Sequence, residues 1–410
     1  MAACSSVNVD FILLILLLVP VIAASSVHSE DRTISIVYNP NCTTDACHNT
    51  SDYKNLVYVK AEGTQDIIHY LWSSIGAPTI LLVRTSKDAE LRVNWDKVLN
   101  SENGGIVFVP SSEVTYSMAL VISRLIEYND SNNNADLETK NTTKHVTLLQ
   151  NLQWQDMSLS INETKHTALM MTTLYQPLLK ENGTISIQLR AFATHDRSDI
   201  LPHLLYTSNT TQMDVSLNGL VPMYKASRFA IEMLAIKNGH NAKKNISIHM
   251  SRSIDDEYTP GMFKVYELHL PSQPPSHYGG YCQWKPVCYG NQIRDLANAL
   301  EVKYYDEKYT DVYIPSSIIN NYFVMDQVDM TSFNISFGTP KDGFYNATRY
   351  TGWTVNIAYG TPPEDQLSLL IIIVISAGLG LPVFLIFVGG IIICVRKRKE
   401  KYKELHLVVN

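Results

Sequence analysis

The sequence predicts a mainly β protein: a β-sandwich-type ectodomain, built as one domain or as two subdomains, followed by one C-terminal transmembrane helix. Three observations lead to this prediction. Short β-type runs alternate with polar breaks, the 410 residues include 23 tyrosines that suit half-buried pleated surfaces, and uncharged apolar segments lie near both ends of the chain. Many short strands at such spacing are typical of a sandwich.

The first apolar segment, residues 11–22, reads FILLILLLVPVI and is followed by the small residues AASS. Twelve apolar residues are too few to cross a hydrocarbon core of about 30 Å as a helix. They match instead the apolar centre of a secretory signal peptide before a small-residue cleavage site. We therefore expect residues 1–25 to be a signal peptide and residues 26–366 to form a lumenal ectodomain.

The second apolar segment, residues 367–395, contains 29 residues without a charge, which is ample for a membrane-spanning helix. Residues 396–410 hold six Lys and Arg against two Glu. This net charge of +4 leaves −10 on the rest of a chain whose total is −6. Positive residues beside a spanning helix stay in the cytosol, so we expect a type I orientation with a basic cytosolic tail.

The apolar segment contains glycines at which a second membrane helix could pack closely, although glycine is also simply common in spanning helices. These glycines are Gly378, Gly380, Gly389 and Gly390. The acidic remainder of the chain has no stripe of Lys and Arg of the kind that binds phosphates. We therefore expect the membrane, and no nucleic acid, among the partners of the protein.

The region between the apolar segments carries ten N-x-[ST] sequons, severalfold more than chance gives. We expect most of them to be glycosylated and therefore exposed, so that sugars shield the surface from proteases. The ten asparagines are Asn41, Asn49, Asn129, Asn141, Asn162, Asn182, Asn209, Asn245, Asn334 and Asn346.

Four cysteines share this region: Cys42, Cys47, Cys282 and Cys288. An even number in an oxidising compartment indicates two disulfides, with three connectivities possible and the short spacings favouring local pairs. Neither pair has the C-x₂-C spacing of a zinc site and no His pair lies beside them, so we expect no metal and no other cofactor.

The β-type runs are separated by turn-rich breaks, and the most polar break, residues 129–144, is a plausible domain boundary. The run RFAIEMLAI at 228–236 is apolar on every side of a helical wheel, so a strand is at least as good an interpretation as a helix. The clearest strand candidates are 33–38, 55–63, 79–85, 105–111, 184–195, 245–250 and 333–338.

No catalytic signature is present: the sequence contains no GxSxG, no HExxH and no Gly-rich phosphate loop. The acidic run Asp255-Asp256-Glu257 could supply the two carboxylates of a glycosidase, but a solvated turn explains it better. The pair His195-Asp196 is too unspecific to indicate a Ser-His-Asp site. We expect a protein that is not an enzyme.

The tail contains Tyr402-Lys403-Glu404-Leu405, which matches the Y-x-x-Φ signal that clathrin adaptors read on membrane cargo. Recognition requires an extended peptide that pairs with a sheet edge while Tyr402 and Leu405 fill two pockets. We expect this signal to direct the protein to lysosomes.

The chain resembles the glycosylated lysosomal membrane protein family. The resemblance rests on blocks spread from the ectodomain to the tail: 67–85, 92–95, 104–114, 119–128, 252–268, 283–289, 333–338 and 359–365. It implies an accessory subunit, without enzymatic activity, of a polytopic lysosomal dipeptide transporter of the major facilitator superfamily, which the subunit would shield from proteolysis. Two alternatives stay open: a membrane-tethered lysosomal hydrolase using Asp255 or Glu257, and a cell-surface adhesion or receptor glycoprotein.

Overall fold

The chain divides into two units, which we treat separately: the ectodomain unit, Ser29–Asp365, and a unit that joins Met1–His28 with Gln366–Asn410. The expected signal peptide lies outside the described residues. The computed structural model describes residues 30–43, 47, 53–176, 181–239, 246–253, 258–272, 279–306, 312–364 and 369–407.

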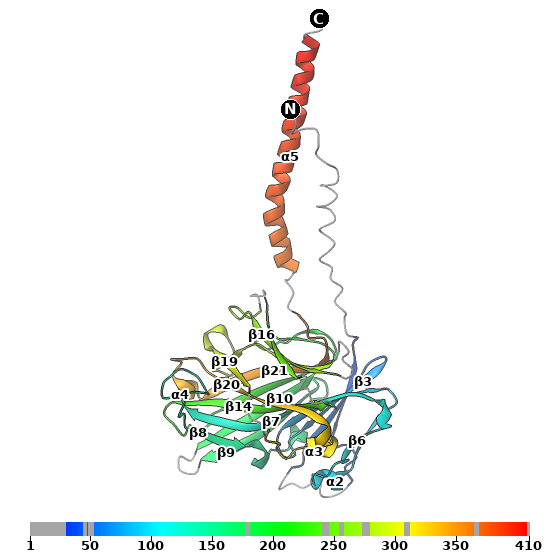
Figure 1. The fold of residues 1–410 in the computed structure, drawn as a ribbon, viewed down its shortest axis with the longest axis vertical. Coiled ribbons are helices and arrows are strands. Elements are labelled where there is room, and N and C mark those ends of the chain that lie inside the picture. The colour runs from blue at the N-terminus through cyan, green and yellow to red at the C-terminus, as the bar shows by residue number, and fades with distance from the viewer. Residues whose placement is uncertain are drawn as a thin grey trace. The chain divides into compact units, whose positions relative to one another are not determined.

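The first layer of the ectodomain is an antiparallel sheet, confirming the prediction of a mainly β fold (Figure 1). Strand β7 (Val114–Asn129) pairs with β4 (Thr79–Ser86) along its first half and with β8 (Lys144–Leu148) along its second half. From one edge to the other the strands are β1 (Thr33–Tyr38), β2 (Leu56–Glu62), β3 (Asp66–Ser73), β4 (Thr79–Ser86), β7 (Val114–Asn129), β14 (Ser227–Asn238), β20 (Val328–Phe337) and β19 (Ala299–Asp306).

The second layer is also antiparallel. Strand β18 (Val287–Tyr289) pairs with β19 of the first layer and with β21 (Tyr350–Gly360) of the second. It therefore joins the layers into one continuous sheet of 17 strands. The order across the second layer is β9 (Thr167–Gln176), β10 (Glu181–Ala191), β13 (Thr210–Asn218), β21 (Tyr350–Gly360), β17 (Gly279–Trp284), β16 (Lys264–Pro271) and β15 (Ser247–Arg252).

The main core lies between the two layers. Ile185, Ile187 and Leu189 alternate along β10 and belong to the same buried cluster as Trp72 of β3 and Leu82 of β4. Every second residue of a strand faces the same side, so this alternation places the apolar face of each layer inward. The arrangement is a sandwich, as the short strands predict.

A second core covers the opposite face of the first layer. Leu71, Leu81 and Val121 point to this side and pack against Trp95 and Phe108. The cover consists of α2 (Trp95–Leu99), the hairpin of β5 (Glu90–Val93) with β6 (Ile106–Val109), and α3 (Ile319–Tyr322). Strands β3, β4, β7 and β14 are therefore buried on both faces, which explains why residues 228–236 are apolar on every side.

The remaining elements of the ectodomain are short. The polar break at 129–144 is not a domain boundary, because it lies within one compact unit and buries Ala135 and Leu137, each 1% exposed. The short elements are β11 (Asp196–Arg197), β12 (Leu205–Tyr206), α4 (Phe344–Thr348) and the 3₁₀ turns η3 (Ser111–Glu113), η4 (Leu149–Asn151), η5 (Met157–Ser160), η6 (Leu296–Asn298) and η7 (Met325–Gln327).

Helix α5 (Leu369–Leu407) covers most of the span expected at 367–395 and continues into the basic tail, with Pro382 inside it. Within the described part of the chain, we find no helix that meets the combined length and apolarity of a membrane span. That this segment crosses a membrane remains a prediction.

Candidate functional site

Most of the sequons that the structure describes lie where a sugar can be attached. Asn129 and Asn209 are half-buried, and Asn49 and Asn245 lie outside the described residues. The exposed ones are Asn41, Asn141, Asn162, Asn182 and Asn346.

Asn334 departs from the expectation that sequons are exposed. It lies in β20, between Glu232 of β14 and Tyr305 of β19, and is 6% exposed. A buried strand position has no room for a bulky hydrated sugar. Whether any of the ten sequons carries a glycan remains a prediction.

One long segment of the ectodomain carries no sequon: residues 246–333, between Asn245 and Asn334. This segment supplies seven of the fourteen large apolar side chains that are exposed in the described ectodomain. They are Met250, Tyr258, Phe263, Ile293, Leu296, Ile314 and Val324. Exposed apolar groups without sugars are typical of a surface that contacts another protein.

Within this segment lies a groove of about 790 Å³, which we call the β16–β19 groove. The turn before β16 contributes Met262 and Phe263, and Phe263 is 43% exposed. The turn that leads into β19 carries two further exposed apolar side chains, Ile293 and Leu296, which are 81% and 66% exposed but do not line the groove. The residues that line the groove itself are Arg252, Ser253, Gly261, Met262, Phe263, Lys264, Pro286, Val287, Ala299, Leu300 and Glu301.

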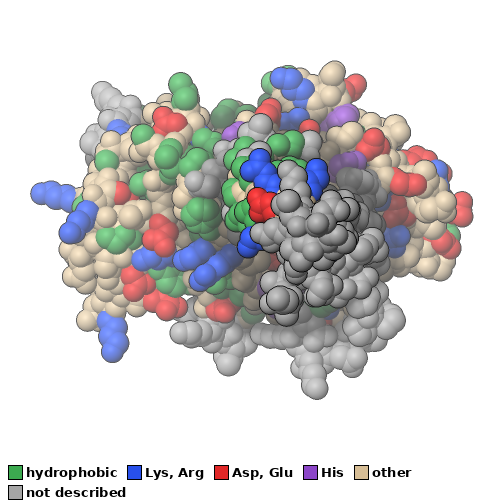
Figure 2. Space-filling view, turned by 90° about the horizontal axis from the view of Figure 1, so that it is seen from above, with side chains coloured by type: hydrophobic (Ala, Val, Ile, Leu, Met, Phe, Trp, Pro, Cys, Tyr) green, Lys and Arg blue, Asp and Glu red, His purple; other side chains and the backbone are tan. Residues whose placement is uncertain are grey.

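Charged side chains of both signs border the groove. Arg252, Lys264 and Glu301 are exposed and line it together with the apolar residues. Figure 2 gives a view from above that of Figure 1, and on this face hydrophobic side chains are interspersed with Lys, Arg, Asp and Glu side chains. An apolar centre with a charged rim is the usual anatomy of a protein interface.

Several buried charges are explained by structural ion pairs. Arg228 of β14 is 2% exposed and lies 2.7 Å from Asp130 and 2.6 Å from Asp342. Lys237 of the same strand is 0% exposed and lies 2.7 Å from Asp329. Buried charges that are paired in this way are structural rather than catalytic groups.

The stretches considered for catalysis gain no support. Asp255, Asp256 and Glu257 lie outside the described residues. His195 Nδ1 lies 3.8 Å from Asp31 rather than beside a carboxylate of Asp196, whose Oδ1 accepts a hydrogen bond from the Arg197 backbone. Across the described residues, no group of three or more His, Cys, Asp and Glu side chains is arranged to hold a metal ion.

One of the two expected disulfides is present, between Cys42 and Cys47, whose Cα atoms are 6.2 Å apart. The expectation of a second disulfide is wrong, because Cys282 and Cys288 are free thiols. Cys282 pairs with Leu268 and Ile357 in the sheet, whereas Cys288 pairs with Leu300.

Burial raises the pKa of both free thiols to about 12, and neither is more than 1% exposed. Thiols of this kind are inert core groups, because the thiolate is the reactive form.

The remaining candidates lie in α5. A Cβ atom added to any of the glycines would meet nothing within 4 Å, so no described residue packs on them. Gly378 and Gly389 are three turns apart and share a face. Tyr402 and Leu405 lie in the helical part of the tail, not in the extended form that adaptors bind. Sorting and helix packing remain predictions.

Sequence reasoning missed the groove, although the sequence contained a signal for it. The gap between Asn245 and Asn334 is visible in the spacing of the sequons. The turns around the groove have no periodicity that would mark them as a site. Only the fold brings residues 252, 263, 287 and 300 to one place.

Comparison with known proteins places the chain in a family. It matches the family described as glycosylated lysosomal membrane protein over residues 55–400. It is 35% identical to glycosylated lysosomal membrane protein A of Xenopus laevis over 382 residues, 90% of this chain and 91% of that protein. Similar relatives of the same name are those of Danio rerio, 35% identical with 84% and 85% of the two chains covered, and of Homo sapiens, 29% identical with 86% and 87% covered.

This name is that of a membrane glycoprotein and not that of an enzyme, which agrees with the sequons and with the lack of a recognisable catalytic motif. The match extends from strand β2 to the basic tail and covers both units of the chain. The chain therefore belongs to the glycosylated lysosomal membrane protein family.

Proposed function

We propose that the protein is a single-pass type I glycoprotein of the lysosomal membrane that acts as an accessory subunit. It binds a polytopic dipeptide transporter of the major facilitator superfamily and protects this partner from lumenal proteases. The observation that carries the proposal is the β16–β19 groove, an exposed apolar surface in the longest stretch without a sequon. The class of transporter follows from the family resemblance.

The anchoring in the membrane is supported by α5. Residues 367–395 are uncharged, and the side chains of Phe384 and Ile386 in this helix are 64% and 76% exposed. Exposed apolar side chains on a helix suit lipid or a second membrane helix. Gly378 and Gly389 on one face would allow the second helix to approach closely.

Protection follows from mass action. A partner bound at a free concentration 100 times its dissociation constant is stabilised by about 2.7 kcal/mol, and its cleavable loops are covered at the same time. The sugars expected at the other faces of the ectodomain shield the subunit itself. Adaptors that recognise Tyr402 and Leu405 would carry the complex to lysosomes.

The test is a rescue experiment in cells that lack the protein. We expect the transporter to be less abundant in these cells while its messenger RNA is unchanged. Inhibition of lysosomal proteases should restore it. Wild-type protein should restore it too and should co-purify with it from membranes solubilised in detergent.

A groove variant tests the interface. Met262→Glu with Phe263→Glu places charge on two apolar side chains that line the groove and should reduce co-purification at least tenfold, because apolar anchors at interfaces commonly contribute about 1.4 kcal/mol or more. The matched control is Leu159→Glu with Tyr175→Glu, which changes residues that are 88% and 59% exposed elsewhere. Equal rescue by both variants would show that the groove is not the interface. Normal transporter abundance in the deleted cells would exclude protection altogether.

A further inference from the structure

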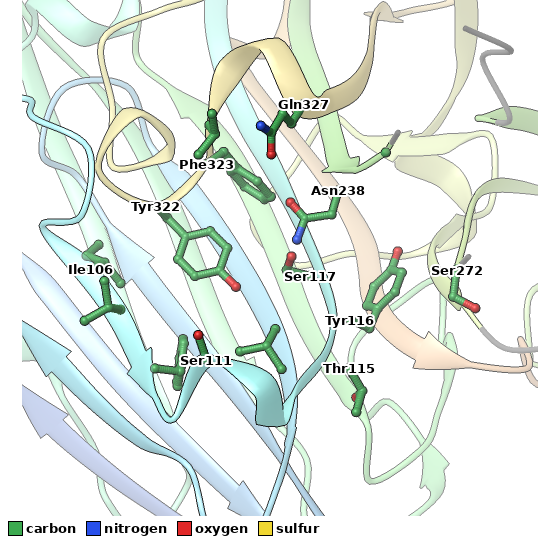
Figure 3. Close-up of a pocket in the computed structure, with 15 residues that line it drawn as sticks. Ile106, Ser111, Thr115, Tyr116, Ser117, Asn238, Ser272, Tyr322, Phe323 and Gln327 are labelled. Atoms are coloured by element: carbon green, nitrogen blue, oxygen red, sulfur yellow. The ribbon is translucent and has the colours of Figure 1, made fainter. Parts of the chain in front are cut away.

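A second cavity, of about 500 Å³, lies on the other side of the first layer from the main core. Figure 3 shows that its walls come from β6, the start of β7, the end of β14 and the segment from α3 to η7. Its size falls within the range of small-molecule sites in proteins. The cavity is separate from the β16–β19 groove, and the two share no lining residue.

The cavity carries no charge. None of its lining residues is Asp, Glu, Lys, Arg or His. The charges next to it are paired: Lys237 lies 2.7 Å from Asp329, and Arg84, which donates a hydrogen bond to Thr115, lies 2.5 Å from Asp66. A charged ligand would lose its hydration here without gaining a partner of opposite charge, which is strongly unfavourable. The lining therefore favours neutral ligands over phosphorylated, zwitterionic and acidic ones.

Polar groups nevertheless converge on the cavity. Figure 3 shows the amides of Asn238 and Gln327 and the hydroxyl groups of Ser117 and Tyr322 turned toward its interior. Asn238 and Gln327 are exposed, and their amides have no hydrogen-bond partner among the described side chains and backbone, so they are free to bond to solvent or to a ligand. A purely apolar ligand, such as a sterol, would leave all these groups without partners.

Ser117 is the most informative of these residues. It is 1% exposed, and its buried Oγ has no hydrogen bond of good geometry with any described group. Burial raises the pKa of Tyr322 to about 12, and a side-chain hydrogen bond with Ser117 opposes this, so the two hydroxyl groups lie within reach of each other. Buried hydroxyl groups in native proteins almost always have a partner, so a bound ligand or water would complete this one.

The aromatic wall of the cavity is rigid. The Tyr322 ring stands nearly perpendicular to Phe108, with centroids 6.2 Å apart, and to Phe323, at 4.9 Å. Phe108 packs in turn on His69, at 4.5 Å, whose nitrogens lie 2.8 Å from the hydroxyl groups of Tyr58 and Thr85. A ring fixed in this way offers an apolar surface without a loss of side-chain entropy on binding.

We propose that this cavity binds a neutral carbohydrate ring, a hexose or an N-acetylhexosamine. Sugar hydroxyl groups both donate and accept hydrogen bonds, which matches amide and hydroxyl groups that do the same. The C–H face of the ring packs on Tyr322. The sugar is either free in solution or the terminal residue of a glycan on another protein, because the same chemistry would recognise both.

The proposal can be tested by saturation-transfer NMR with the full chain in detergent micelles. The probes are N-acetylglucosamine and glucose as free sugars, and N,N′-diacetylchitobiose linked to a protein as a glycan terminus. We expect transfer to the ring protons of a neutral sugar and none to glucose 6-phosphate. Binding of the free sugars supports a small-molecule site, and binding of the linked disaccharide alone supports recognition of glycans.

Three variants examine the residues themselves. Asn238→Ala and Ser117→Ala should each weaken binding about two- to tenfold, the range of one hydrogen bond. Ser117→Ala should keep or raise the melting temperature, because it removes a buried hydroxyl without a satisfactory partner. The matched control, Asn132→Ala, changes another exposed asparagine and should bind normally.

Three results would overturn the proposal. They are no transfer to any neutral sugar at millimolar concentration, equal affinity in all variants, and stronger binding of a blocked neutral dipeptide than of any sugar. The last result would identify the cavity as a peptide site.

Discussion

Replacement of Arg228 by Met should destabilise the ectodomain more than any change at a surface ion pair. The guanidinium group lies 2.7 Å from Asp130 and 2.6 Å from Asp342, and it also donates to Asn133 Oδ1 and to the Thr339 carbonyl. The variant would leave two buried carboxylates without their cation. Breaking a buried pair in this way costs about 3–5 kcal/mol.

The expected shift in melting temperature follows from the size of the unit. The entropy of unfolding is about 2.1 cal/mol/K per residue, or about 0.7 kcal/mol/K for the roughly 340 residues of Ser29–Asp365. A loss of 3–5 kcal/mol therefore lowers the melting temperature by about 4–7 °C. The matched control is Arg190→Met, which breaks an ion pair with Asp199 whose side chains are 36% and 74% exposed and should change it by about 1 °C or less.

In the wild type, the stabilising contribution of Asp342 should be complete at both pH 7 and pH 5. Burial alone would raise the pKa of Asp342, but the hydrogen bond from Arg228 and two backbone hydrogen bonds outweigh it, so the net pKa is lowered. A carboxyl group with a lowered pKa stabilises the fold above its unfolded value near 4, and this contribution is lost only as the pH falls through the lower folded value.

Differential scanning fluorimetry of the full chain in detergent, at both pH values, measures the effect. A melting temperature of Arg228→Met within 1 °C of wild type, or equal to that of Arg190→Met, would refute the argument that this buried network holds the start of β14 to the segments that follow β7 and β20.

Three further predictions concern the sugars, the tail and the anchor. Asn334→Gln should not change the electrophoretic mobility of the protein, because a buried β20 position excludes a glycan from the folded state. Asn141→Gln, at an exposed position, should increase the mobility. A faster band for Asn334→Gln would contradict the burial. Tyr402→Ala should move the protein to the cell surface, because the adaptor pocket loses the tyrosine ring; continued lysosomal residence, seen by surface biotinylation, would show that this residue is not the signal. The ectodomain cut before Pro362 should be secreted and should still bind the transporter through the groove. If the secreted form does not bind while the anchored form does, α5 rather than the groove recognises the transporter.

The strands that the sequence predicted well are those with one apolar face. Thr33–Tyr38 was expected and found with the same limits, because its alternating exposure leaves a period of two in the sequence. Residues 55–63 were found to within two residues of β2. In these elements local pattern and tertiary environment agree, so the sequence alone is sufficient.

Strand β14, which two cores bury, is the element whose type the sequence left open between helix and strand. Strand β14 shows no alternation, because one face packs in the main core and the other against the cover of α2, β6 and α3. It also buries the charged residues Arg228, Glu232 and Lys237, whose ion-pair partners are 92 or more residues away in the sequence. No local signal reveals such pairing.

The cysteines and the groove show the same limit. Short spacing correctly favoured the pair Cys42 and Cys47, but the equally short spacing of Cys282 and Cys288 misled, because the sheet register aligns them with different neighbours. The groove is lined by residues at 252–253, 261–264, 286–287 and 299–301, which lie at the ends of strands and come together only in the fold. Its place in the sequence is marked only by the missing sequons.

The burial of β7 and β14 on both faces determines how the protein resists degradation. Each strand is hydrogen-bonded along both edges, β7 to β4, β8 and β14, and β14 to β7 and β20. Their amide protons can exchange with solvent only when both cores open together, that is, by nearly global unfolding. Cleavage inside this part of the chain is then governed by the small equilibrium population of the unfolded state rather than by local fraying. A protein built in this way can lose an exposed loop to a protease and keep its central strands intact.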